Sequence, residues 1–230
     1  MAELARAIRI SKPAAHAILQ TYLARGLVGY AGEGAQRRYR LGLGLARLGD
    51  TALRNISLID VALPELRELS RELELTSRVA IFEDGHAVVV GRVDGPGAVR
   101  FDAALGRREL LHCSAVGKAL LAEKTEQEVR AILRRHGLPR RTPKTISRAA
   151  TLMAELREVK ARGYAIDDEE DCEGVACIGA CVFDRTATPV AAISVTGLKG
   201  RDFAKRKEEL GAAVKARAAR ISVLLGASPH

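Results

Sequence analysis

At 230 residues with 47% hydrophobic side chains, the chain can build one large or two modest globular domains with well-filled cores. No apolar run reaches the roughly 18 residues of a membrane span, and the first residues lack the apolar stretch of a signal peptide. The composition therefore excludes a membrane-embedded chain and indicates a soluble, cytoplasmic protein without a membrane partner.

The net charge of +9 is concentrated near the N-terminus. Residues 1–57 hold nine Lys and Arg against three acidic residues, which gives this segment +6 of the total. A basic small domain joined to a nearly balanced larger one indicates a nucleic-acid partner for the first. A merely well-solvated surface is the alternative explanation of the same charges.

The N-terminal residues have the pattern of a winged helix-turn-helix. A short helix at 3–8 is followed by a tight turn, and Ser11 is placed to cap a second helix that runs to about Arg25. Two short alternating segments, 27–30 and 37–41, then predict the hairpin that forms the wing. Such a unit places its second helix in the major groove of DNA.

Apolar and polar residues divide the second helix into two sides. The inward stripe consists of Ala15, Ile18, Leu19, Tyr22 and Leu23. The DNA-facing candidates are Ser11, Lys12, His16 and Gln20 on the helix, with Arg37, Arg38 and Arg40 on the wing, where they would meet phosphates or the minor groove.

The following segments predict an α+β fold in which a mixed or antiparallel sheet has helices on one side and a pocket on the other. Helical periodicity marks a linker at 43–55, whose apolar side could pack against a second chain, and an amphipathic helix that begins at Ser57. The further predicted elements are strands at 76–82, 87–93 and 100–105 and helices at 125–136, 149–162 and 201–225. We therefore divide the chain into a DNA-binding domain at 1–41, a linker helix at 42–57 and a second domain at 58–230.

A predicted hairpin near the C-terminus carries small and hydroxyl-bearing side chains. Its strands cover 175–183 and 189–196. Period-2 alternation places Cys177 and Gly179 on one face of the first strand, and Ser194 and Thr196 on one face of the second. A sheet face of this kind leaves room for a ligand.

A second candidate ligand element lies at residues 112–122, HCSAVGKALLA. Ser114 is placed to cap a helix, which would leave the amides of Ala115, Val116 and Gly117 as donors at the positive end of the helix dipole. Such a start suits a carboxylate or phosphate. An ordinary capped helix that binds nothing is the alternative.

The four cysteines at positions 113, 172, 177 and 181 do not have the spacing of a common zinc site. We expect buried, reduced thiols and no metal, with Cys177 as a candidate wall of the pocket.

These motifs resemble a known family. HCSAVGKALLA, followed by GYAIDDEEDCEGVACIGACVFD and AAISVTG, is similar to the ligand-binding domain of the isocitrate-lyase-regulator (IclR) family of bacterial transcription regulators. The resemblance runs from about Leu4 to the end of the last helix. It implies a winged helix-turn-helix joined to a GAF-like effector domain, a double-stranded DNA operator, a homodimer or tetramer, and no cofactor.

The resemblance also implies where the ligand binds. The family's ligand contacts correspond to the amides of Ala115 and Val116 and to the side chains of Asp167, Cys177, Ser194 and Thr196. A small organic acid would place its carboxylate on the amides and hydroxyls. Asp167 would accept a hydrogen bond from a hydroxyl or amine of the ligand, while Asp168 to Asp171 are more typical of a solvated acidic loop.

The chain departs from the family in its DNA-binding half. A first helix of the winged domain is absent from this sequence, and Pro13, Ala14 and Ala17 replace side chains that would reach base edges. An effector-binding or dimerising protein that has lost DNA binding is therefore one alternative. An enzyme is the other, since Cys113, His112 and Asp167 lie near the expected site.

Overall fold

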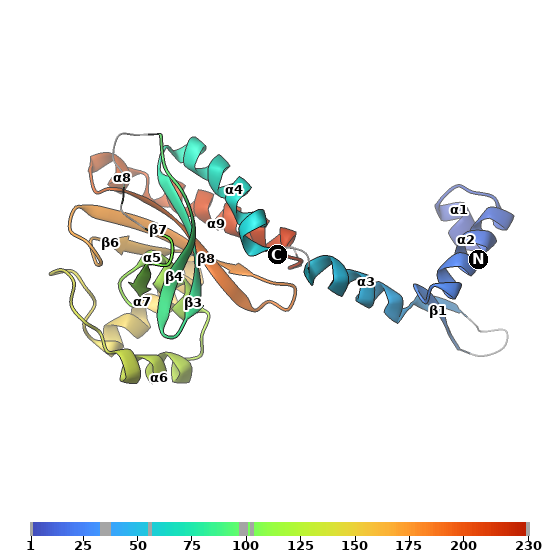
Figure 1. Ribbon diagram of the computed structural model, residues 1–230, viewed down its shortest axis with the longest axis horizontal. Coiled ribbons are helices and arrows are strands. Elements are labelled where there is room, and N and C mark those ends of the chain that lie inside the picture. Colours follow the sequence, from blue (N-terminus) through green and yellow to red (C-terminus); the bar gives the residue numbers. More distant parts are fainter. Residues whose placement is uncertain (1, 33–37, 55–56, 97–100, 102–103, 229–230) are drawn as a thin grey trace. The chain divides into compact units, whose positions relative to one another are not determined.

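The computed structural model describes residues 2–32, 38–54, 57–96, 101 and 104–228 (Figure 1). The chain divides into two compact units, Met1–Ile56 and Ser57–His230. Within the described ranges, no helix is both long and apolar enough to cross a membrane.

The first unit is a helix-turn-helix followed by a hairpin. Its elements are α1 (Ala2–Ala7), α2 (Lys12–Ala24), the antiparallel strands β1 (Val28–Ala31) and β2 (Arg38–Leu41), and α3 (Leu43–Arg54). Ser11 caps α2 as predicted, since its Oγ accepts a hydrogen bond from the Ala14 amide at 3.3 Å. The winged helix-turn-helix and the helical linker are both present at the expected positions.

The apolar stripe of α2 is only half covered. Ala15 and Leu19 are buried, whereas Ile18 and Tyr22 expose 42% and 45% of their surface. Leu4 and Ile8 of the α1 region are exposed to a similar extent. The first unit therefore presents exposed apolar side chains on α2 and in the α1 region.

The second unit is built on a six-stranded antiparallel sheet in the order β5-β4-β3-β8-β7-β6. The strands are β3 (Thr76–Glu83), β4 (His86–Val93), β5 (Arg108–Leu110), β6 (Ala165–Asp168), β7 (Val175–Phe183) and β8 (Pro189–Leu198). The two predicted hairpins, β3–β4 and β7–β8, form the centre of this sheet, with β3 and β8 paired to each other.

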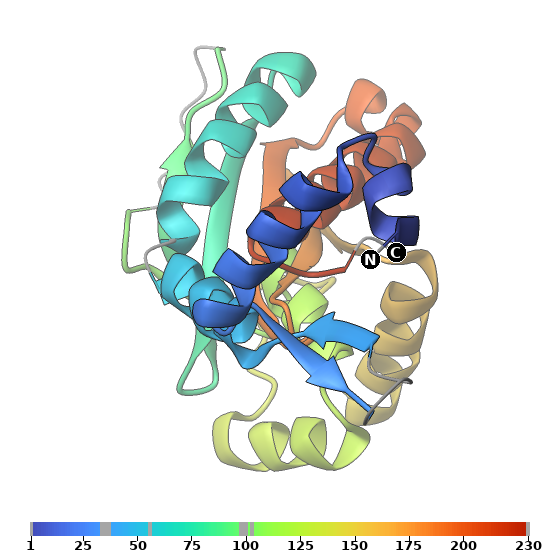
Figure 2. The same ribbon diagram turned by 90° about the vertical axis from the view of Figure 1, so that its right-hand side faces the viewer.

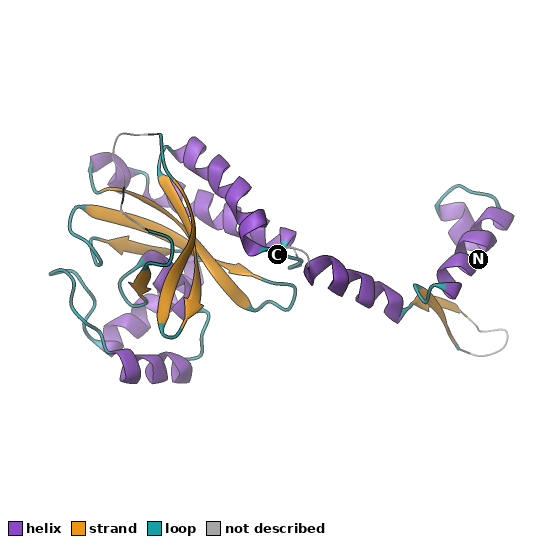
Figure 3. Cartoon of the chain, viewed as in Figure 1, coloured by secondary structure: helices purple, strands orange, loops and turns teal. Residues whose placement is uncertain are grey.

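Helices cover both faces of the sheet, which corrects the expectation of helices on one side only (Figure 3). One face carries α4 (Leu58–Leu73) and α9 (Lys207–Leu224), and the other carries α5 (Ala115–Ala122) and α7 (Ala149–Arg162). Helix α6 (Glu126–His136) packs beside α7, and the short α8 (Arg201–Lys205) precedes α9 (Figure 2).

The two faces of the sheet differ in side-chain size. Val79, Ile178 and Ile193 point into the core beneath α4 and α9. On the opposite face Ala80 and Ala192 pack against α5. Because strand side chains alternate, small residues beneath α5 allow this helix to lie close to the sheet without weakening the other core.

Three predicted elements differ from the observed ones. The third strand in chain order is Arg108–Leu110; of the strand expected at 100–105, residues 100, 102 and 103 lie outside the described residues, and 101, 104 and 105 are not in a strand. The last helix is two helices, broken after Lys205. Strand β6 was not predicted, because its four residues AIDD lack the β-branched and aromatic enrichment of a strand.

Candidate ligand-binding site

The strand register brings three of the predicted site residues into one row. Asp167 on β6 is opposite Cys177 on β7, which is opposite Thr196 on β8. The Cys177 Sγ and Thr196 Oγ1 atoms lie 3.3 Å apart. The next row on the same face holds Ser194, directly opposite Gly179 on one side and Arg78 on the other. The alternation argument therefore placed the hairpin side chains on the correct face.

The start of α5 lies directly on this face. Ser114 Oγ accepts a hydrogen bond from the Gly117 amide at 3.1 Å and donates one to the Leu110 carbonyl at 2.9 Å. A methyl group at Gly179 would lie 3.0 Å from the carbonyl carbon of Ala115, so the absence of a side chain there permits the close approach. The prediction that Ser114 caps α5 is confirmed. The ligand-binding residues that we predicted at the start of this helix need one correction.

That correction concerns Gly117. Its amide is already bonded to the cap, so it is not a free donor for a ligand. Its role is steric, because a methyl group at this position would lie 2.5 Å from the Leu111 Cα. The candidate donors are reduced to the amides of Ala115 and Val116.

A buried arginine completes the site and was not predicted. Arg78 on β3 donates from Nη1 to Glu109 Oε1 at 2.7 Å and from Nη2 to Thr196 Oγ1 at 2.6 Å. Burial opposes its charge, but the electrostatic attraction of Cys177, and after it of Glu109, Asp167 and Asp171, outweighs that effect and raises the pKa of Arg78. The signal in the sequence was a charged residue in the middle of the strand, on the same face as Thr76 and Ala80 and directly before the apolar run Val79 to Phe82.

Asp167 is buried, with 3% of its surface exposed, and is held by backbone amides. Its Oδ1 accepts hydrogen bonds from the amides of Glu170 and Asp171 at 2.8 and 3.3 Å. Burial is the main cause that raises the pKa of Asp167 to about 7, and the neighbouring Glu170 adds to it. This carboxyl therefore changes its charge near neutral pH, so it can either accept or donate a hydrogen bond there.

The acidic segment after Asp167 is not a solvated loop. Lys118 of α5 is completely buried, and its Nζ donates to the Ile166 carbonyl at 2.5 Å and to the Glu170 carboxylate. Asp168 binds Lys199 and Lys207 at 2.5 and 3.0 Å. Burial works against ionisation of Asp168, but these two lysines outweigh it and lower its pKa to about 2. The segment is a set of ion pairs that fixes the end of β6.

A cavity of about 250 Å³ opens on this face of the sheet. Its wall consists of Arg78, Phe101, Arg107, Glu109, Ser114, Asp167, Asp171, Cys172, Val175, Cys177 and Thr196. Four predicted residues, Ser114, Asp167, Cys177 and Thr196, are therefore brought together, whereas Ala115, Val116, Gly117 and Ser194 are not part of the wall. Ser194 is paired in register with Arg78 of the wall, and its buried Oγ has no hydrogen-bond partner among the described residues.

The buried thiols of Cys113 and Cys177 are protonated at neutral pH. Burial raises the pKa of Cys177 to about 12 and also raises that of Cys113. The Cys113 thiol contacts Asp171 at 3.6 Å, while His112 Nε2 is bonded to the Pro139 carbonyl at 3.1 Å. These groups do not form the activated thiol and base of a nucleophilic enzyme. All four cysteines are free, and Cys172 is exposed rather than buried as expected.

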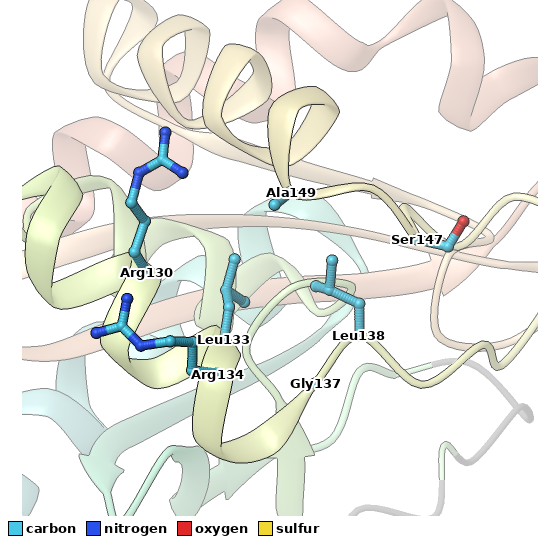
Figure 4. Close-up of a pocket in the computed structure, with 7 residues that line it drawn as sticks. All are labelled: Arg130, Leu133, Arg134, Gly137, Leu138, Ser147 and Ala149. Carbon is cyan, nitrogen blue, oxygen red and sulfur yellow. The ribbon is translucent and has the colours of Figure 1, made fainter.

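Larger hollows elsewhere among the described residues of the second unit do not combine a buried arginine with buried hydroxyls; one of about 500 Å³ lies between α4 and β4, and two are larger still. One, of about 590 Å³, lies between α6 and the start of α7, where Figure 4 shows Leu133 and Leu138 between two arginines and Ser147. Arg130, at its edge, is already paired with Glu126 at 2.6 Å. The other, of about 610 Å³, lies between α9 and the β7–β8 turn and is mainly apolar. The smaller cavity, with its buried charges and hydroxyls, is the candidate site.

The predicted DNA contacts are exposed in the first unit wherever the structure describes them. Ser11, Lys12, His16 and Gln20 are exposed along α2, and Arg38 and Arg40 are exposed on β2. Arg37 lies outside the described residues.

Comparison with known proteins gives consistent matches over most of the chain. A family model described as "Bacterial transcriptional regulator IclR C-terminal" matches residues 50–223. The HTH-type transcriptional regulator KdgR of Escherichia coli (strain K12) is 34% identical over 224 residues, covering 97% of this chain and 84% of the relative. The transcriptional repressor IclR of the same strain is 31% identical over 228 residues, covering 98% and 82%. The crystal structure of the Agobacterium tumefaciens repressor BlcR has a TM-score of 0.84 at 25% identity, covering 99% of this chain and 89% of that one.

Proposed function

The chain belongs to the IclR family of bacterial transcriptional regulators, and from that premise we propose that its first unit binds an operator while its second senses a small organic acid. It is a regulator and not an enzyme, as its relatives are. The proposal adds the sites and the ligand class to this assignment.

One observation carries the ligand proposal, namely the convergence of a buried arginine and hydroxyls on a small cavity. Arg78 and Thr196 line it, and the unsatisfied Ser194 hydroxyl and the start of α5 lie beside it. A carboxylate on these groups would form charge-assisted hydrogen bonds of about 1.5–3 kcal/mol each, whereas a neutral analogue would lack the attraction between opposite charges at Arg78. A cavity of about 250 Å³ suits a molecule of few atoms.

Asp167 supports a second feature of the ligand. In its ionised form it repels a bare anion, so a hydroxyl or amine on the ligand would face it and donate a hydrogen bond. The proposed effector is therefore a small acid that carries such a donor. The effector site would comprise Ser114, the amides of Ala115 and Val116, Asp167, Cys177, Ser194 and Thr196, with Arg78 added.

A thermal-shift screen of small organic acids tests this proposal, because a ligand that binds only the folded state raises its melting temperature. Ser194→Ala should remove most of the shift that an active acid produces, while Ser147→Ala, an exposed serine beside the hollow of Figure 4, should leave it unchanged. A full shift in the Ser194 variant would show that the acid binds elsewhere. Consumption of the acid during the assay would contradict the regulatory assignment.

The DNA-binding proposal depends on α2 and the wing. Lysine and arginine contacts to phosphate make affinity fall with salt. Fluorescence anisotropy on duplexes selected from a randomised pool measures this salt dependence directly. The exposed apolar residues Leu4, Ile8, Ile18 and Tyr22 favour one alternative, an effector-binding protein without DNA binding. Failure to select any duplex, together with a positive acid screen, would support that alternative.

We further propose a homodimer, or a tetramer made of two such dimers, formed in part through α3. Leu45 and Leu48 of this helix expose 40% and 55% of their surface, and Leu43 exposes 89%. A two-fold assembly also matches the symmetry of a two-fold operator. Light scattering over a wide concentration range tests it, and a monomer at every concentration would contradict it.

A further inference from the structure

Arg78, the strongest anion-binding group of the cavity, is already paired with a carboxylate, that of Glu109. Arg78 and Glu109 both line the cavity, and their side chains are only 8% and 3% exposed. A single hydrogen bond of 2.7 Å joins them. Any carboxylate that enters the cavity therefore meets an arginine that holds another carboxylate.

The charges around the cavity oppose simple addition of an anion. Arg78 and Arg107 are its cations, while Glu109, Asp171 and, above about pH 7, Asp167 are its anions. An added carboxylate would give these anions an excess over the cations below about pH 7, and would enlarge the excess above it, in a poorly solvated space. Exchange of one carboxylate for another leaves the charge balance at Arg78 unchanged.

The existing pair leaves hydrogen-bonding capacity unused. Arg78 Nε and Ser194 Oγ are both buried without partners among the described residues. The two residues are directly opposite each other on β3 and β8. Arginine binds a carboxylate best through two parallel N–H bonds, whereas Glu109 forms one. A carboxylate from outside can therefore improve on the contact that it replaces.

From these contacts we infer that Glu109 is a resident carboxylate that occupies the anchoring position on Arg78 and is displaced when an acid binds. Arg78 is then the residue that selects an acid over its neutral amide. This inference rests on the proposed function, since it explains how the effector cavity discriminates among ligands.

The displaced carboxylate has a second cation within reach. Arg107 Nε lies 4.0 Å from Glu109 Oε1, and the Arg107 side chain is 38% exposed. Glu109 can thus turn toward Arg107 at the mouth of the cavity. Arg107 also contacts Asp171 at 3.4 Å, so this movement would change the pairing of the acidic segment as well.

The displacement would be transmitted along β5. This strand has three residues, lies at the edge of the sheet and pairs only with β4 in the described sheet. Leu110, next to Glu109, accepts hydrogen bonds from the Ser114 amide and hydroxyl at 3.2 and 2.9 Å. A shift of Glu109 therefore reaches the N-terminal cap of α5 within one residue.

The test compares full-length parent protein with Glu109→Gln, using propionate and propionamide as probes at matched ionic strength. Removal of an intramolecular competitor should increase the apparent affinity for propionate by roughly ten-fold or more, read from the concentration dependence of the melting temperature. Propionamide should show no such increase. Glu83→Gln is the matched control, because Glu83 of β3 forms an exposed pair with Arg108 of β5, next to Glu109 in the chain, and its replacement should not alter propionate binding.

Arg78→Gln combined with Glu109→Gln keeps the test informative if the single variant is unstable. This pair of changes removes both charges and should abolish the preference of propionate over propionamide. Unchanged or weaker propionate binding in Glu109→Gln would overturn the exchange. If an organic acid stabilises the parent and Glu109→Gln equally, the proposed effector function stands and only the exchange is wrong.

Discussion

The replacement of Lys118 by methionine is expected to be among the most destabilising single changes in the second unit. Lys118 is completely buried, and it is the ion-pair partner of Glu170, whose side chain is only 11% exposed. Methionine preserves the length of the apolar stem, so the substitution removes charge with little loss of packing. Glu170 would remain as a buried carboxylate without its cation.

The size of the effect follows from which partners remain. Glu155, 3.8 Å from Lys118, keeps its contact with Arg162 at 2.7 Å, so it is still paired. Glu170 has no such reserve, because its Oε2 has no partner among the described residues and its Oε1 binds Lys118. Removing one partner of a buried pair costs about 3–5 kcal/mol. For a unit of this size that corresponds to a fall of roughly 6–20 °C in melting temperature.

Urea unfolding followed by circular dichroism measures the cost, since the chain has no tryptophan to report by fluorescence. The informative comparison adds Glu170→Gln and the double variant. Neutralising both partners should cost less than the sum of the two single changes by at least about 1 kcal/mol. A loss below about 1 kcal/mol in Lys118→Met, or strictly additive costs, would refute the conclusion that this ion pair holds α5 to the end of β6.

Three further changes test other parts of the structure. Burial raises the pKa of Asp167 from 3.8 to about 7, so the folded state resists the ionisation that the unfolded state undergoes, and the free energy of unfolding falls as the pH rises through this range. In thermal unfolding, Asp167→Asn should therefore stabilise the protein at about pH 8 and have little effect near pH 4. Gly179→Ala would place a methyl group 3.0 Å from the Ala115 carbonyl carbon and should cost about 1–3 kcal/mol in urea unfolding, whereas Gly200→Ala meets open space and should not. Replacing Arg38 and Arg40 by alanine should reduce the salt slope of DNA binding by about 2, and an unchanged slope would show that the wing does not contact phosphates.

Local patterns were enough to predict much of the fold. The caps at Ser11 and Ser114 and the two hairpins β3–β4 and β7–β8 all depend on residues near one another in the chain. The row of Cys177 and Thr196 follows from strand alternation and the short connection between their strands. The family resemblance added Asp167, which β6 brings opposite Cys177.

The charged partners of the site could not be predicted in the same way. Arg78 and Glu109 are separated by 31 positions, and Lys118 and Glu170 by 52. The residues that flank a charged side chain do not reveal whether it points to solvent or to a distant counter-charge, because only the assembled fold brings the partners together. The same limit explains why the segment after Asp167 was expected to be solvated.

The two faces of the sheet separate stability from ligand selectivity. Val79, Ile178 and Ile193 form the core beneath α4 and α9, whereas Arg78 and Cys177, each adjacent in sequence to a core residue, face the cavity. A substitution at a cavity position therefore leaves the apolar packing of the other face in place, so that its cost is set by charge pairing rather than by a void. If Glu109 is the resident carboxylate, a single neutral residue at that position would convert a cavity that requires exchange into one that accepts an acid directly. Ligand preference in this fold can then change through one ion pair while the sheet and its main core remain as they are.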